Sequence, residues 1–189
     1  WLRLGYEHHS DVETAAGVAQ ALDPTGRNSS NRYNADISYD IKNIEHWDTT
    51  FQLSYLDTSA ESNLTLFPPN TFDTIFPGGF SDGVIGNPSV YERHSRCNLS
   101  TFYTGWQRHR IRLGGGMEYS DLYKVSETKN YTILPGGTPL PLGSIINVSS
   151  SDAFMEPHDR TDSYVFTQDE WSLANDWALT GGIRYDNYS

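Results

Sequence analysis

Apolar and polar residues alternate along most of this chain. Between residues 31 and 41, for example, Tyr33, Ile37 and Ile41 share one parity while Arg32 and Asp36 share the other. Side chains of a strand point alternately to the two faces of a sheet, so this period of two predicts strands with one apolar face. About seven segments match the pattern: residues 2–7, 31–41, 47–55, 96–104, 110–119, 163–173 and 177–186. In the sixth of these, residues 163–173, both faces contain apolar and polar residues.

Short and long connections alternate between these segments. KNIEH, WQR and AND are hairpin-length links, whereas about 22, 33 and 39 residues follow Tyr6, Tyr55 and Tyr119, beyond the ~12–15 at which a structureless loop becomes unusual. In residues 12–22, VETAAGVAQAL, a weak apolar stripe stopped by DPTG predicts a short loop helix and nothing longer. The alternation predicts an antiparallel up-and-down sheet with every long loop at one end.

Two all-β architectures offer one apolar and one polar face, a soluble sandwich and a transmembrane β-barrel. Aromatic residues bracket the apolar faces, as Trp47 with Tyr55 and Trp177 with Tyr185, where a membrane girdle would lie. Eight tilted residues cover roughly 20 Å, near the ~25 Å apolar band of an outer-membrane barrel. Charged side chains that would line a wet lumen, or the solvated face of a sandwich, are Asp36, Arg96, Arg110, Arg112, Glu118 and Arg184. Long loops at one end favour the barrel.

Composition narrows the function. Twelve tyrosines and sixteen glycines suit strands and turns, and a formal net charge of -11 argues against a nucleic-acid partner. Cys97 is the single cysteine, so no intrachain disulfide can form, and no apolar run reaches the ~18 residues of a transmembrane helix. Both ends of the chain lie inside alternating segments and WLRLGYEHH has no signal-peptide pattern, so we expect a piece of a larger barrel.

No catalytic motif is present, and we expect no enzyme, metal or cofactor. Asp169 and Glu170 are adjacent, but neighbouring strand residues face opposite sides and cannot form a carboxylate pair. Oxygen and nitrogen ligands for a divalent metal gather in residues 8–13, although a solvated loop is the preferred interpretation there. The Gly114–Gly116 run lies mid-strand and predicts a bend or close packing against a neighbour.

Near the end of the chain, QDEWSLANDWALTGGIRYDNYS resembles the TonB-dependent outer-membrane receptors. Their barrels contain a Gln-Asp-Glu-Trp strand, a short turn, a Trp-x-Leu-Thr-x-Gly strand and an Arg-Tyr-Asp ending. The matching residues are Gln168, Asp169, Glu170, Trp171, Trp177, Leu179, Thr180, Gly182, Arg184, Tyr185 and Asp186. A weaker resemblance joins LSTFYTGWQRHRIRLGGGMEYSDLY to the preceding hairpin of the ferric-catecholate and colicin-receptor branch.

The resemblance implies a 22-stranded barrel, filled by a plug domain, in the bacterial outer membrane. It also implies uptake of an iron chelate, a siderophore, powered by the TonB complex through the plug. We find neither a plug domain nor a TonB box, so residues 1–189 are expected to be a partial barrel of about seven strands. Two alternatives stay open: a soluble or cell-surface sandwich that binds carbohydrate, and a passive porin or adhesin barrel.

Ligand contacts are expected in the long loops, which the resemblance places outside the cell. Cations suited to an anionic chelate are Arg27, Arg93, Arg96, Lys124, Lys129 and Arg160. Aromatic candidates for stacking are Phe76, Phe80 and Tyr131, although packing against one another is the commoner use of such rings. The loops are net acidic, which suits contact with outer-membrane lipid and lipopolysaccharide through divalent cations.

Overall fold

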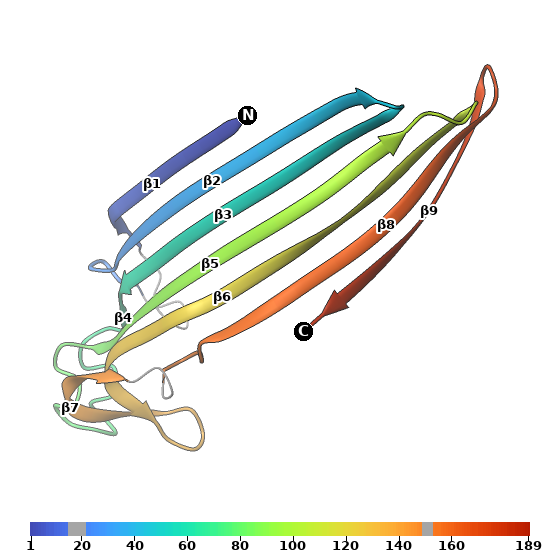
Figure 1. Ribbon diagram of the computed structural model, residues 1–189. Helices are drawn as coiled ribbons and strands as arrows, with labels where there is room; N and C mark the ends of the chain where they lie inside the picture. The colour runs from blue at the N-terminus through green and yellow to red at the C-terminus, as the bar shows by residue number, and fades with distance from the viewer. Residues whose placement is uncertain (15–21, 149–152) are drawn as a thin grey trace.

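The computed structural model describes residues 1–14, 22–148 and 153–189. Nine strands form one sheet: β1 (Leu2–Glu13), β2 (Arg27–Ile44), β3 (Trp47–Asn63), β4 (Thr65–Phe67), β5 (Val84–Tyr103), β6 (His109–Ile133), β7 (Pro139–Val148), β8 (His158–Ala174) and β9 (Trp177–Tyr188). The seven long strands lie in the order β1-β2-β3-β5-β6-β8-β9, each antiparallel to its neighbours (Figure 1). The up-and-down topology predicted from the alternating connections is confirmed.

Short turns lie at one end of the sheet and long connections at the other (Figure 1). At the short-turn end, Glu45 and His46 join β2 to β3, and both have positive φ values, of 49° and 72°. Two residues with positive φ form the type I′ turn that matches the twist of paired strands. The two short strands belong to the long-loop end, where β4 pairs with β5 and β7 with β6.

The strands extend much further than the alternation predicts. β6, for example, spans 25 residues, whereas the pattern marked only residues 110–119. The strands continue past Tyr6, Tyr55 and Tyr119, so the long connections begin later along the chain than predicted. The predicted loop helix is wrong at Val12 and Glu13, which belong to β1, and residues 15–21 lie outside the described residues. In the described ranges, no helix has the length and apolar character needed to cross a membrane.

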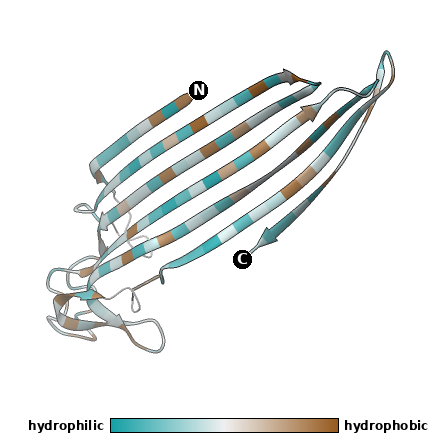
Figure 2. Cartoon of the chain, in the orientation of Figure 1, coloured by the Kyte–Doolittle hydropathy of each residue, from teal (hydrophilic) through white to brown (hydrophobic). Residues whose placement is uncertain are grey.

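The strand register separates two faces. Leu2, Ile37, Leu53, Cys97 and Met117 are cross-strand partners in one row. The neighbouring row, one residue along each strand, is polar or charged and consists of Arg3, Asp36, Ser54, Arg96 and Glu118. Figure 2 shows this alternation as hydrophobic and hydrophilic bands along the long strands. We call the two sides the apolar face and the polar face.

Hydrophobic burial is confined to the long-loop end. In the described ranges the buried apolar side chains are Phe80, Val84, Leu122 and Val125, and Phe80 is only 2% exposed. The segment 64–83 folds back here, and the Phe72 ring meets the rings of Phe67 and Phe80 edge-on, at 5.2 and 5.8 Å. No second sheet covers the apolar face within the described residues, so the sandwich alternative does not fit.

Asp23 fastens the first long loop to the second. Its side chain is fully buried; Oδ2 accepts the backbone N–H of Thr65 at 2.6 Å, and Oδ1 accepts the N–H and hydroxyl of Thr25 at 3.2 and 3.0 Å. Hydrogen bonds to an ionised acceptor are stronger than neutral ones, so a buried carboxylate with three donors is a firm attachment. The two loops thus form one folded unit at this end.

Candidate lumenal site and the barrel wall

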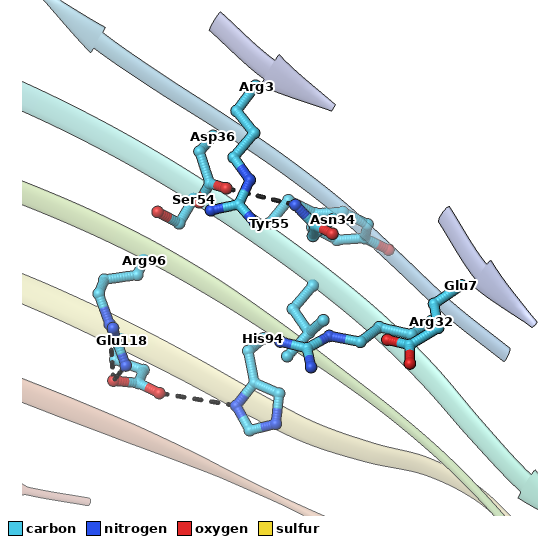
Figure 3. A pocket seen from close by; sticks show the side chains of 11 residues that line it. Arg3, Glu7, Arg32, Asn34, Asp36, Ser54, Tyr55, His94, Arg96 and Glu118 are labelled. Carbon is cyan, nitrogen blue, oxygen red and sulfur yellow. Dashed lines mark hydrogen bonds and ion pairs between the residues drawn. The ribbon is translucent and has the colours of Figure 1, made fainter. Parts of the chain in front are cut away.

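A hollow of about 480 Å³ lies on the polar face about midway along the strands (Figure 3). It crosses β1, β2, β3, β5 and β6, and its polar lining is Arg3, Glu7, Arg32, Asn34, Asp36, Ser54, His94, Arg96 and Glu118. The register brings these residues together, because Arg3, Asp36, Ser54, Arg96 and Glu118 form one row and Asn34 and His94 lie in the next.

Part of this hollow is a closed network of charges. The Arg96 guanidinium holds Glu118 Oε2 with Nε at 3.0 Å and Nη2 at 2.6 Å. His94 Nδ1 lies 2.9 Å from Ser120 Oγ, and its Nε2 lies 3.0 Å from Glu92 Oε1. Two charge-assisted hydrogen bonds from one guanidinium to one carboxylate oxygen hold Arg96 against Glu118. The charge of Arg96 is therefore already neutralised by the wall.

Arg3 and Arg32 differ from Arg96 in this respect. In the described part of the chain, neither guanidinium forms an ion pair, although both line the hollow. Figure 3 shows Arg3 beside Asn34 and Ser54 and Arg32 reaching toward His94. Gly5 leaves room for Asn34, since a Cβ there would lie 2.3 Å from Asn34 Oδ1. The hollow thus offers two guanidinium groups that form no direct ion pair within the described residues, although each lies opposite a carboxylate of the same hollow, Asp36 for Arg3 and Glu7 for Arg32.

The apolar face carries aromatic residues at two levels. Trp47 and Tyr103 are partners near the short turns, with ring centroids 4.6 Å apart, and Tyr6 and Tyr33 stack at 4.8 Å nearer the long loops. Exposed apolar side chains fill the band between these levels, among them Ile37, Leu53, Leu99, Val165 and Ile183. Amphipathic rings at two levels around an apolar band match the two interfaces of a bilayer.

A single antiparallel sheet with this outer band, a charged inner face, short turns at one end and long loops at the other is the wall of an outer-membrane β-barrel. Residues 4–189 match the family model described as TonB dependent receptor-like, beta-barrel, and the chain belongs to this family. Among curated proteins no match was found.

Membership of the family assigns the two faces and the two ends. The barrel lies in the bacterial outer membrane, so the apolar face meets lipid, the polar face is the lumen wall, and the long loops are extracellular. The family is one of transporters rather than enzymes, whose members interact with TonB and carry a ligand. The family match also favours a receptor over a passive porin or adhesin.

The residues of the closing motif alternate between these two faces. Asp169, Trp171 and Tyr185 are on the lipid side, and the lumen side holds Gln168, Glu170, Arg184 and Asp186. On the lipid side, His109 Nδ1 lies 2.7 Å from Asp169 Oδ2, and its ring stacks on Trp171 at 5.5 Å. The motif therefore builds a periplasmic aromatic girdle and part of the lumen wall at once.

The predicted ligand residues do not come together. Arg27, Arg93, Arg96, Lys124, Lys129, Tyr131 and Arg160 lie on strands rather than in loops. Arg93 pairs with Asp121 on the lipid side at 2.6 Å, whereas Arg160 pairs with Asp162 on the lumen side at 2.8 Å. Arg27 pairs with Glu13 and Lys129 with Glu127, and Lys124 lies 4.3 Å from the centre of the Tyr91 ring.

The aromatic residues predicted to stack on a ligand differ in how deeply they are buried. Phe80 is buried in the folded loop, so it packs there and is not open to a ligand, while Phe76 and Tyr131 are half-buried. Burial raises the pKa of the Tyr131 phenol, with a smaller contribution from Glu127. Within the described ranges no three His, Cys, Asp or Glu side chains are placed to hold a metal ion; His8 instead contacts Asn31 and His9 contacts Glu7.

Sequence reasoning placed Asp36, Arg96 and Glu118 on the polar face, and the register confirms that placement. It did not single out Arg3, Arg32, Asn34 or His94 as members of a site. A signal existed for Arg3, Arg32 and Asn34, which lie at the polar positions of their segments, whereas His94 lies before the segment that begins at residue 96. Only the register between strands, however, shows that they lie at one height.

Proposed function

We propose that this barrel wall belongs to a receptor that imports an iron chelate, and that the lumenal hollow contacts the chelate on its path. The observation that supports this best is the pair of guanidinium groups, on Arg3 and Arg32, with no ion-pair partner in the described residues. Siderophore-type chelates present carboxylate or phenolate oxygens around the metal, and guanidinium binds such oxygens in a fork. Of the cations predicted from the sequence, Arg96 lines the same hollow, and Arg27, Lys129 and Arg160 are proposed to act nearer the loops.

Uptake of radioactive iron tests this proposal. The full receptor is produced in a bacterial strain lacking its own siderophore receptors, and uptake from 55Fe-loaded carboxylate and catecholate chelates is measured below saturation. Loss of two charge-assisted contacts, in the Arg3→Gln/Arg32→Gln double variant, is expected to reduce uptake of one class by about tenfold or more. Arg108→Gln, at the periplasmic turn, is the matched control and should transport normally. Unchanged uptake in the double variant would refute the role of the hollow.

We further propose that a plug domain of the whole receptor fills the lumen and couples it to TonB. On the outside, the lipid-facing wall above the Tyr6 and Tyr33 level is proposed to contact lipopolysaccharide. Lys124 supports this, because it is on the lipid side of the wall, beside the Tyr91 ring, and forms no ion pair in the described residues. Lys124→Gln should reduce the lipopolysaccharide that copurifies with the receptor, measured by mass spectrometry, and an unchanged amount would count against this contact.

A further inference from the structure

Arginine and aromatic side chains form a continuous stack on the lumen wall near the periplasmic end. The Arg110 guanidinium lies 4.4 Å from the centre of the Phe102 ring, and Arg112 lies between Phe102 and Phe166 at 5.4 and 5.1 Å. Phe166 stacks on Tyr164 at 6.3 Å. Phe102 is an apolar residue at a polar position of its alternating segment, and on the polar face its ring contacts these two arginines.

A recess of about 420 Å³ opens beside this stack. Arg112, Phe166, Gln168, Gly182 and Arg184 line it. Small residues create the space: Gly182 is the cross-strand partner of Gln168, and a Cβ on Gly182 would lie 2.9 Å from the Thr167 carbonyl oxygen. The recess is distinct from the hollow around Arg3 and Arg32, with which it shares no lining residue.

The two arginines of the recess differ in whether a carboxylate neutralises their charge. Arg184 is neutralised by Asp186, since its Nε donates to both carboxylate oxygens at 2.9 and 3.0 Å and its Nη2 to Oδ1 at 2.7 Å. Arg112 Nε is buried without a hydrogen-bond partner among the described residues, and no described carboxylate pairs with this guanidinium. A buried donor left unsatisfied is costly, and more so on a charged group. The recess therefore has one unmet cationic donor.

We propose that this recess is a carboxylate-binding site in which Arg112 provides the guanidinium fork and Gln168 the second donor. A carboxylate is planar and singly charged, and it accepts two parallel N–H groups from one arginine. The recess beside Phe166 has room for such a group. A phosphate, tetrahedral and nearly doubly charged, would need a second free cation, and Arg184 is already paired with Asp186. This site is additional to the chelate contacts proposed above and does not depend on them.

Two sources can supply the carboxylate: an Asp or Glu side chain of a protein segment inside the barrel, and a small soluble carboxylic acid. NMR of the full receptor in detergent, labelled with 15N-arginine, distinguishes the two sources through the arginine Nε–H signals. The signal that disappears in the Arg112→Lys variant is the Nε–H signal of Arg112. Sodium benzoate, a planar carboxylate, is the added probe.

An Arg112 Nε–H signal that shifts saturably with benzoate would support the site and a soluble ligand. A signal already protected from exchange with water, and unmoved by benzoate, would support the site and a protein carboxylate, provided that acidifying the sample releases it. An Arg112 Nε–H that exchanges freely with water, and whose signal does not shift when benzoate is added, would overturn the proposal.

Arg110→Gln is the control, because Arg110 stacks on the same Phe102 ring but lies outside the recess. This variant should leave the Arg112 signal and its benzoate response unchanged, whereas Gln168→Leu should weaken benzoate binding by about tenfold. Equal losses in both variants would show that the effect is general electrostatics and refute a defined site. Because the readout is binding, a failure here leaves iron uptake through the Arg3 and Arg32 hollow untouched, and the reverse also holds.

Discussion

The Tyr164 hydroxyl donates a hydrogen bond to Asn98 Oδ1 at 2.9 Å, reaching from β8 to β5 across the intervening strand β6. The path is open because the β6 residue between them is Gly116, the cross-strand partner of both. A Cβ on Gly116 would lie 2.3 Å from Asn98 Oδ1 and 2.9 Å from the Tyr164 hydroxyl. Gly114 likewise leaves room for Phe166, whose ring carbons would lie 2.6 Å from such a Cβ. The prediction of close packing at the glycine run is confirmed.

Gly116→Ala is therefore expected to destabilise the barrel. The added methyl group meets the Cys97 carbonyl oxygen at 2.9 Å as well as the two side chains, so backbone must shift. Overpacking of this kind typically costs about 1–3 kcal/mol of the free energy of unfolding. The measurement is urea unfolding of the receptor in lipid vesicles, followed by tryptophan fluorescence.

Gly181→Ala is the matched control, because no described atom lies within 4 Å of a Cβ at that position. It should unfold at the urea concentration of the wild type or slightly above. Equal stability of the two variants would show that the Tyr164–Asn98 contact does not require a glycine between its partners.

Asp23 is expected to hold the extracellular loops together. Asp23→Ala leaves the part-buried Thr65 N–H without its acceptor, a loss of about 1–3 kcal/mol, whereas the two donors of exposed Thr25 can turn to water. Limited proteolysis should then cut the segment 64–83 several times faster, with the membrane-embedded strands intact. Asp82→Ala, an exposed carboxylate in the same segment, should be cut at the wild-type rate; faster cutting in both variants would refute a specific role for Asp23.

Tyr91 is expected to titrate at unusually high pH. Its hydroxyl donates to Glu61 Oε1 at 2.5 Å, and this hydrogen bond, followed by burial, raises the pKa of the phenol from 10.0 to about 12. A raised pKa means that the stabilising contribution is complete below pH 10 and is lost as the pH rises toward 12. The absorbance difference at 295 nm between wild type and Tyr91→Phe should show this late transition, and Glu61→Gln should move it toward pH 10. A wild-type transition already near pH 10 would contradict the contact.

The alternation of apolar and polar residues predicts the strands and their order well but predicts the length of the strands poorly, and both results have one cause. The period of two is visible only where one face meets lipid, as at Leu53 or Leu99. Beyond the bilayer both faces are wet, so a stretch such as residues 57–63 of β3 loses the pattern although its backbone ladder continues. Ladder hydrogen bonds do not depend on side-chain polarity, so the sequence alone marks the membrane band rather than the strand.

The lumenal sites were predicted only in part, for a different reason. Parity alone places Arg96 and Arg112 on the polar face, but whether a cation is paired depends on which carboxylate the register brings opposite. Arg96 meets Glu118, its direct partner, whereas Arg112 meets Phe102 and Gln168. Such differences arise from contacts between strands, which a single sequence does not reveal.

Cys97 and Ser54 offer the most direct test of the central claim, that alternate residues of this sheet face lipid and lumen. The partner of Cys97 is Leu53 and the partner of Arg96 is Ser54, so the two positions lie at nearly one height on opposite faces. A nitroxide is attached to native Cys97, or to Ser54→Cys in a Cys97→Ser background, in the full receptor in vesicles. Paramagnetic resonance should show Cys97 relaxed mainly by membrane-dissolved oxygen and the label at position 54 mainly by a water-soluble nickel complex. The same preference at both positions, or the reverse one, would contradict the account.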